Sequence, residues 1–300
     1  MLSYRRRIVV NTKSVRRSAA RLVVRDLARQ KSGLVGLAII ATVVLAAILA
    51  PYLGGNSPTR INLEERLASP LTVTDTGFRV LGTDGLGRDV FTRILFGARI
   101  SVIVGITATS ISALIGIVLG LIAGFYGGVP DVMTSRSAEI VLAFPFILLA
   151  LTFLAILGNG LLQIILVLGV GRWATFFRVI RGRVLSLRDL EFVMASRAVG
   201  ASNTRIMVRH ILPNIAAPVI VVASFTIATN ILAEAALSFL GLGIDPAIPA
   251  WGSMLAEGRE YLPRGWWIAT FSGSAIMITV LGINLVGDWL RDYLDPRLKL

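Results

Sequence analysis

The residues that usually carry enzyme chemistry are scarce in this sequence. It holds a single histidine, His210, and no cysteine, so neither a multi-histidine metal site nor a cysteine nucleophile can be assembled from it. The glycine-rich stretch 82–89, GTDGLGRD, lacks the Gly-Lys-Ser/Thr ending of a phosphate-binding loop. We therefore expect no catalytic residue, no metal site and no cofactor bound by this chain itself.

Three polar side chains lie inside long apolar stretches, where a charge costs about 3 kcal/mol or more and usually serves a function. They are Glu234, Arg172 and Asn230. Two interpretations of Glu234 stay open: it lines or gates a path, or it pairs with a loop arginine or caps the backbone. Arg172 is expected to face the helix bundle or a wet vestibule. Asn230 is also a path candidate, although an interhelical hydrogen bond is favoured for it.

The elements that carry these residues are membrane spans. Of the 300 residues, 55% are hydrophobic and only 16% are charged, against about a quarter in soluble domains. Several runs without any charge approach or exceed the roughly 20 residues that a spanning helix needs. The longest, 140–171, is interrupted by Gly158-Asn159-Gly160 and must form two helices. The sequence thus predicts six transmembrane helices, over 32–53, 99–125, 136–157, 161–181, 213–240 and 266–289.

Two local signals refine these helices. Pro145 lies between two phenylalanines, and we expect it to mark a kink rather than a gate. Gly116, Gly120 and Gly124 are four residues apart and therefore share one helical face, where backbones can approach closely. Packing within this chain is favoured over a contact between subunits.

Charge sets the predicted orientation. The first 31 residues hold ten Arg or Lys against one acid, and such segments stay in the cytoplasm. This topology also explains the net charge of +13, so no nucleic-acid partner is expected. The chain is predicted to be an all-α polytopic membrane protein in a lipid membrane, with both termini cytoplasmic. Its parts are a tail (1–31), the first span (32–53), an extracytoplasmic loop (54–98), a five-helix core (99–290) with a cytoplasmic loop at 182–212 and an extracytoplasmic loop at 241–265, and a tail (291–300).

The segment 191–214, EFVMASRAVGASNTRIMVRHILPN, is a basic island between apolar spans. Its apolar residues recur mostly every three or four positions, which is a helical pattern, and Gly200 interrupts them. Ser202 or Asn203 could cap a second helix, and Pro213 suits the first turn of the fifth span. We expect a short helix, a bend and another short helix. Periodicity alone leaves two roles open, an amphipathic helix on anionic lipid or an element that docks into a cytosolic protein.

The same segment resembles the cytoplasmic coupling loop, or EAA loop, of ABC importer permeases. The pattern of that loop is Glu-Ala-Ala, three residues, Gly, nine residues, then Ile-x-Leu-Pro. Ala195, Gly200, Leu212 and Pro213 stand at matching places. Three positions depart from the pattern, because it expects the glutamate where this chain has Met194, the second alanine at Ser196 and the isoleucine at His210. Glu191, one turn earlier, is a candidate to substitute for the missing carboxylate.

The resemblance covers about residues 33 to 290. LGTDGLGRDV at 81–90, GARIS at 97–101, HILPN at 210–214, LSFLGLG at 237–243 and PAWG at 249–252 are similar to the signatures of dipeptide and oligopeptide permeases. The long first loop and basic tail resemble their second, C-type subunit. The implied fold is the type I ABC importer (MetI-like) transmembrane domain, in a bacterial plasma (inner) membrane.

The family implies a set of partners for this non-catalytic chain. They are a homologous second permease subunit, two cytosolic ATPase subunits that bind ATP and Mg, and an extracytoplasmic substrate-binding protein. The resemblance places the ATPase contact on Glu191, Met194, Ala195, Arg197, Ala198, Gly200, Ala201, Ser202 and Pro213. Candidates for the binding-protein contact are Asp84, Arg88, Asp89 and Trp251.

Other functions stay open at this point. The same machinery could import nickel, haem or another small solute instead of di- or oligopeptides. An ion-coupled secondary transporter would need acids on several spans, and only Glu234 lies well inside one. A membrane enzyme lacks catalytic residues.

Overall fold

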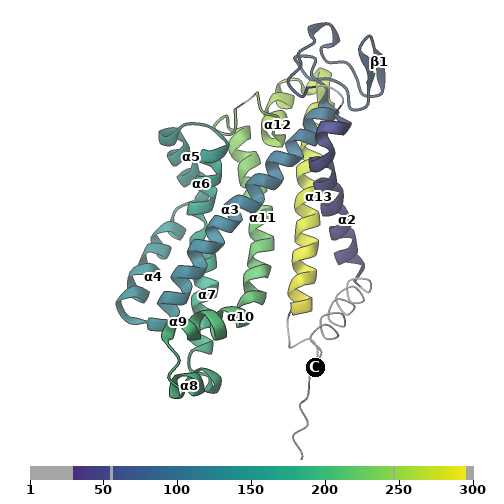
Figure 1. Ribbon diagram of the computed structural model, residues 1–300. Helices are drawn as coiled ribbons and strands as arrows, with labels where there is room; N and C mark the ends of the chain where they lie inside the picture. The colour runs from purple at the N-terminus through teal and green to yellow at the C-terminus, as the bar shows by residue number, and fades with distance from the viewer. Residues whose placement is uncertain (1–29, 55–56, 246, 295–300) are drawn as a thin grey trace, which may run out of the picture.

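The computed structural model describes residues 30–54, 57–245 and 247–294, and most of these residues are helical (Figure 1). The predicted tails 1–31 and 291–300 lie largely outside them. The helices are α2 (Lys31–Leu53), α3 (Val90–Tyr126), α4 (Gly128–Ala143), α5 (Phe146–Leu157), α6 (Leu161–Gly171), α7 (Trp173–Leu187), α8 (Glu191–Ala198), α9 (Asn203–Ile206), α10 (Leu212–Asn214), α11 (Ala216–Phe239), α12 (Trp251–Glu260) and α13 (Leu262–Leu294).

The helices long and apolar enough to cross a membrane agree with the predicted class. Five single spans qualify among the described residues, and the bent pair α4 and α5 brings the number to six if it counts as one. The all-α polytopic fold is therefore confirmed, and the sixth span depends on how that pair is placed.

The second predicted span begins earlier than expected. Helix α3 starts at Val90 rather than at 99 and extends through the end of the predicted loop 54–98. The Asp89 side chain caps it by accepting a hydrogen bond from the backbone N–H of Thr92 at 3.2 Å. The prediction was wrong here because an uncharged run marks the apolar part of a helix, whereas Arg93 and Arg99 lie on its polar extension.

The third predicted span, 136–157, is not one straight helix. α4 begins at Gly128, and the axes of α4 and α5 differ by 91° at the break between them. Phe144 is extended, with φ −91° and ψ 139°, because the residue before a proline avoids the helical region. The kink expected at Pro145 is confirmed.

The remaining spans differ from prediction mainly at their ends. The span predicted at 161–181 runs to Leu187 and is interrupted at Arg172, where α6 ends and α7 begins. The span predicted at 213–240 begins at Ala216, after the separate short helix α10. α13 begins at Leu262 with a non-helical residue at Gly265, so the loop predicted at 241–265 consists largely of helix.

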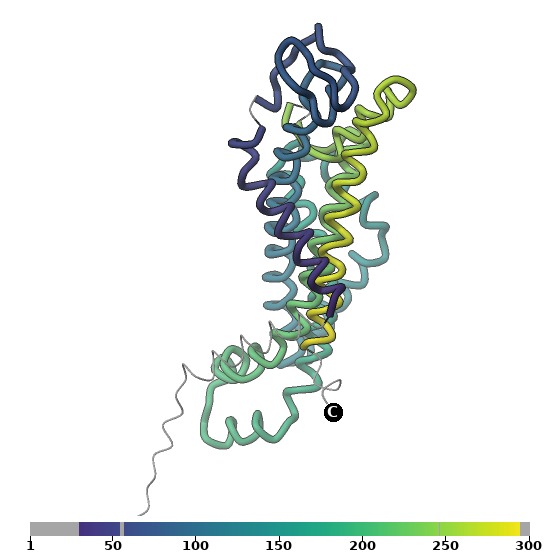
Figure 2. The backbone as a smooth tube through the Cα atoms, turned by 90° about the vertical axis from the view of Figure 1, so that its right-hand side faces the viewer, coloured from purple at the N-terminus to yellow at the C-terminus, as the bar shows by residue number. Residues whose placement is uncertain are grey.

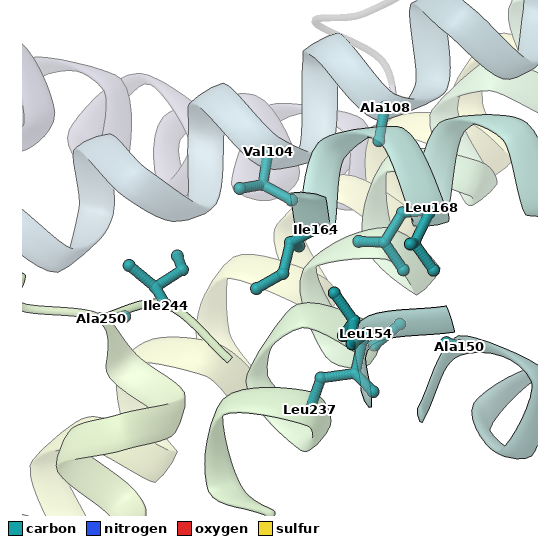
Figure 3. Packing of buried hydrophobic residues seen from close by; sticks show 11 residues of the cluster. Val104, Ala108, Ala150, Leu154, Ile164, Leu168, Leu237, Ile244 and Ala250 are labelled. Carbon is teal, nitrogen blue, oxygen red and sulfur yellow. The ribbon is translucent and has the colours of Figure 1, made fainter. Parts of the chain in front are cut away.

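The central helix α3 packs on α7 through the glycine face. A methyl group at Gly116, Gly120 or Gly124 would overlap Phe176, Ile180 and Val184 of α7, respectively. The expectation of packing within this chain is confirmed. A second apolar cluster joins α3 to the short helices α5 and α6 and to α11 (Figure 3), through Val104, Ala108, Ala150, Leu154, Ile164, Leu168 and Leu237.

The bundle has two chemically different ends (Figures 1 and 2). The hairpin end comprises residues 57–89, α12 and the start of α13. It contains the antiparallel strands β1 (Thr72–Thr74) and β2 (Gly77–Arg79). The α8 end comprises residues 188–214, including α8, α9 and α10. Residues 207–211 form a π-helix between α9 and α10.

Candidate functional site

The α8 end has the helix–bend–helix form that the sequence predicts. α8 ends at Ala198, and Gly200 adopts φ +83°, a left-handed conformation that favours glycine. Ser202 caps α9 by accepting a hydrogen bond from the backbone N–H of Arg205 at 3.4 Å. Of the two predicted caps, Ser202 is confirmed, whereas Asn203 is the first residue of α9.

Two buried side chains fix this segment to the bundle. Val193 of α8 and Ile206 of α9 are fully buried in a cluster with Ile180 and Val184 of α7. The cluster also includes Leu121 of α3. α8 is thus held against the central helix and α7 by an apolar contact beneath it.

The rest of α8 and the turn that follows it are largely exposed and include apolar side chains. Val199 is 88% exposed and Met194 is 55% exposed, and Gly200 has open space where a side chain would stand. The predicted contact residues Glu191, Ala195, Arg197, Ala198 and Ser202 are also exposed, and Ala201 is partly exposed. These predicted contact residues lie close together at the surface, and the prediction did not include the exposed Val199.

Pro213 does not lie where the sequence placed it. It belongs to α10, a separate short helix, and Ile215 breaks the connection to α11 with φ −100° and ψ 0°. The π-helix that precedes α10 was not predicted from the sequence either. Pro213 is exposed, so its place at the surface of the α8 end is unaffected.

Arginines join the base of the α8 end to α3 and α4. Arg188 donates to the backbone carbonyl oxygen of Gly124 at 3.0 Å. Arg181 forms a bidentate pair with Asp131, with Nη2 and Oδ2 at 2.7 Å. Arg197 stacks over the Phe125 ring at 5.2 Å. These contacts connect the loop to the ends of two long helices.

Two of the three path candidates are enclosed within this chain. Asn230 donates to the Thr109 hydroxyl of α3 at 3.0 Å, which confirms the interhelical hydrogen bond. Glu234 is fully buried, and its Oε1 accepts from Ser238 at 2.8 Å while Oε2 has no partner among the described residues. Within the described ranges, Glu234 forms neither the arginine pair nor the backbone cap that the sequence left open. In this conformation both side chains are enclosed within this chain, and a path role for either stays a prediction.

Arg172 is the path candidate that keeps some exposure. It stands at the break between α6 and α7, 4.0 Å from the centre of the Phe146 ring at the start of α5. Its Nε atom is buried and has no hydrogen-bond partner among the described residues. A guanidinium without a carboxylate, at a place where two broken helices meet, stays a path candidate.

The hairpin end contains a buried network of four charges. Asp84 pairs with Arg88 at 2.7 Å and also with Arg93 of α3. Glu257 of α12 pairs with Arg88 at 2.8 Å and with Arg93 at 3.0 Å. The network therefore ties the loop before α3 to α12, far away in the sequence.

Three of the four residues predicted to touch a docked protein are buried, which corrects that prediction. The side chains of Asp84 and Arg88 are buried inside the network, and Trp251 is only 2% exposed. The Trp251 Nε1 donates to the Ile94 carbonyl oxygen at 3.0 Å. These residues hold the hairpin end together rather than forming its surface.

The fourth residue, Asp89, belongs to a second ion pair. Its Oδ2 accepts from Arg79 at 3.2 Å, and Arg79 also pairs with Glu65 at 2.7 Å. Burial raises the pKa of Glu65, but hydrogen bonds from Thr76 and Arg79 outweigh burial and lower that pKa to about 2. The carboxylate is therefore ionised at neutral pH.

Nothing in the described part of the chain suggests metal chemistry. No group of three or more His, Cys, Asp or Glu residues there could hold a metal ion. The four-charge network is internally neutral, with two arginines and two carboxylates.

Family models match two parts of the chain. Residues 116–300, more than half of the chain, match the binding-protein-dependent transport system inner membrane component. Residues 18–70 match the N-terminal TM domain of oligopeptide transport permease C.

Curated relatives cover most of the chain. A dipeptide transport system permease protein of Alkalihalophilus pseudofirmus is 44% identical over 92% of this chain and 89% of its own length. An oligopeptide transport system permease protein of Bacillus subtilis is 39% identical over 90% and 87%. A glutathione transport system permease protein of Pectobacterium atrosepticum is 39% identical over 97% and 95%.

A solved structure shares the fold. A chain of the MetNI methionine ABC transporter, in inward-facing conformations, superposes with a TM-score of 0.55 at 21% identity, covering 68% of this chain and 96% of that one. At this identity the likeness shows the fold alone, and it confirms the predicted MetI-like transmembrane domain. The sequence matches carry the assignment further: the chain belongs to the family of binding-protein-dependent transport system inner membrane components, as a C-type permease subunit of the dipeptide and oligopeptide type.

Proposed function

We propose that this multi-pass permease subunit imports di- and oligopeptides, as half of a pathway completed by a homologous second permease subunit. The curated relatives support peptides as the substrate class, because those of Alkalihalophilus pseudofirmus and Bacillus subtilis are named for dipeptide and oligopeptide transport. The glutathione permease, similar over nearly its whole length, indicates that one such scaffold serves related small peptides.

The α8 end is the proposed contact with two cytosolic ATPase subunits, which bind ATP and Mg. The observation that carries this proposal is the exposed apolar surface of Met194 and Val199 above the buried anchors Val193 and Ile206. A protruding helix that exposes apolar side chains and is attached by buried ones suits binding in the groove of a partner protein. It would also transmit force, because the anchors contact α7 and α3 directly.

The proposed contact with cytosolic ATPases implies an orientation of the chain in the membrane. The α8 end and both termini face the cytoplasm, and the hairpin end faces outward in the bacterial inner membrane. An extracytoplasmic binding protein would then dock on the hairpin end, on exposed residues such as Leu71 and Val73 rather than on the buried Trp251.

In the proposed mechanism this chain does no covalent chemistry. ATP-driven closure of the ATPases moves α8, and the α8 anchors move the inner parts of α7 and α3. Arg172, beside the bend between α4 and α5, is the proposed polar residue of the path.

Gly200→Trp tests the docking assignment. The backbone at Gly200 disfavours any side chain, but open space surrounds it, so the fold should tolerate the change at a cost of about 1 kcal/mol. We expect the variant to insert normally, to lose co-purification with the ATPases and to stop peptide uptake. Gly200→Ala is the matched control, because it carries the backbone strain without the bulk. Normal uptake by Gly200→Trp would sink the assignment.

The substrate class needs a separate test. In the reconstituted complex with its binding protein, we expect di- and oligopeptides to stimulate ATP hydrolysis. Stimulation by nickel chelates or haem, with none by peptides, would replace the peptide proposal by the alternative substrates while leaving the docking assignment intact.

A further inference from the structure

A cavity of about 780 Å³ opens near the α8 end, between the ends of three long helices. Its volume falls within the range of roughly 300–1,000 Å³ that small-molecule sites have. α7, α10, α11 and α13 contribute its lining residues, which are Arg183, Ser186, Leu187, Asn214, Ala217, Pro218, Val221, Val222, Arg291 and Leu294.

The charge on this cavity is unbalanced. Arg183 of α7 and Arg291 of α13 line it, and among the described residues neither forms an ion pair. No aspartate or glutamate is among the described lining residues. The neighbouring Arg181, in contrast, is paired with Asp131. Two arginines, both exposed, therefore line one cavity whose described lining includes no acidic side chain.

The lining of the cavity combines apolar and basic side chains. Ala217, Pro218, Val221 and Val222 recur at helical spacing on one side of α11 and form an apolar wall. The arginines lie on two other helices, near the ends of α7 and α13. A ligand that fits would carry a negative charge at the membrane surface and an apolar part pointing into the bilayer.

We infer that this cavity binds an anionic phospholipid of the inner leaflet, with its phosphodiester between Arg183 and Arg291 and an acyl chain along α11. Basic pockets between helices on the cytoplasmic side bind such headgroups, and each nearby arginine contributes about fivefold in affinity. The inference rests on the proposed orientation only for the choice of leaflet.

The test uses the assembled transporter in nanodiscs that contain phosphatidylcholine and phosphatidylglycerol, followed by mass spectrometry of the lipid retained after purification. We expect the parent complex to retain phosphatidylglycerol selectively. Arg183→Gln combined with Arg291→Gln should reduce that retention by about thirtyfold, since two charges are removed. Arg264→Gln, an exposed arginine at the hairpin end, is the matched control and should change nothing.

A second variant separates a lipid from a protein occupant. Because the chain has no cysteine, Ala217→Cys creates a single labelling site in its apolar wall. Cross-linking of this cysteine to a phosphatidylglycerol that carries a reactive acyl chain supports the inference. Cross-linking to the second permease subunit instead, displacement of the lipid by a transported peptide, or equal lipid retention by the double variant and the control would each overturn it. Peptide uptake and ATPase co-purification are measured separately, so failure of the proposed function is distinguishable.

Discussion

The two ends of the molecule use ion pairs in opposite ways. At the hairpin end the Asp84 side chain is 1% exposed and shared by two arginines, whereas at the α8 end the Asp189 side chain is 76% exposed beside Arg188. Buried pairs are costly to break, because the remaining partner is left charged and desolvated. Exposed pairs contribute about 0–1 kcal/mol.

The apolar residues do not follow the same contrast, because each end buries some and exposes others. The hairpin end buries Trp251 and Trp267, whose indoles donate to backbone carbonyl oxygens at 3.0 Å, and it exposes Val73 and Trp266. The α8 end buries Val193 and Ile206 and exposes Met194 and Val199. The two ends therefore differ in the burial of their ion pairs, whereas both present exposed apolar side chains.

The largest effect is expected from Asp84→Asn. It removes the carboxylate that Arg88 and Arg93 share and leaves Glu257 as their one acidic partner in the network. We expect the free energy of unfolding of the hairpin end to fall by about 3–5 kcal/mol, measured as loss of thermal stability of the purified complex. Glu64→Gln, at an exposed position of the same loop, is the control. Equal stability of the two variants would refute the view that buried charges hold this end.

The next effect concerns function rather than stability. Val199→Asp places a charge on the α8 end, and Val73→Asp does the same at the hairpin end, where Val73 is 78% exposed. Neither should change stability by more than about 0.5 kcal/mol. We expect Val199→Asp to reduce ATPase co-purification at least about tenfold, the equivalent of 1.4 kcal/mol, and Val73→Asp to leave it unchanged. The opposite result would exchange the proposed roles of the two ends.

Acid should loosen the hairpin end selectively. The folded pKa of Glu65 is about 2, below its ordinary value of 4.5, so the carboxylate contributes its full stabilisation above pH 4.5. That contribution is lost as the pH falls through 4.5 toward 2. Amide hydrogen exchange of residues 72–79, relative to an unstructured chain at the same pH, should rise over this range. In Glu65→Gln the rise should disappear; if it persists, Glu65 is not its source.

Glu234→Gln should have a smaller effect than Asp84→Asn, although both replace a buried carboxylate by an amide. No arginine among the described residues depends on Glu234, and a glutamine oxygen can still accept from Ser238. We expect a change of about 1 kcal/mol in stability and normal assembly. A changed peptide preference with normal stability would instead support a role of Glu234 in the translocation path.

The smallest effect is expected from Asp189→Asn, the counterpart of Asp84→Asn at the α8 end. Its pair with Arg188 spans 3.4 Å and is largely exposed, and Arg188 keeps its bond to Gly124. We expect at most about 0.5 kcal/mol by thermal denaturation. A loss comparable to that of Asp84→Asn would remove the contrast between the two ends.

Much of the fold could be read from the sequence because its signals are local. Uncharged runs predict spans, Pro145 predicts the kink, and the interrupted periodicity around Gly200 predicts helix, bend and helix. The ends of the helices were predicted less accurately than their existence. α3 begins at Val90 because Asp89 caps it, and a cap inside a charged loop is hidden from a hydropathy criterion.

The sequence by itself determined the class, the approximate spans, the helix–bend–helix shape of the α8 end and the family, since each depends on residues close together or on matching motifs. The tertiary structure alone decided which polar residues are buried. Asp84 and Glu257 pair with the same two arginines although they are far apart in the chain. Because of these pairs, residues that were predicted to form a docking surface are buried instead. Periodicity gives the face of a helix on which a residue lies, but only the packing of helices against one another determines what covers that face.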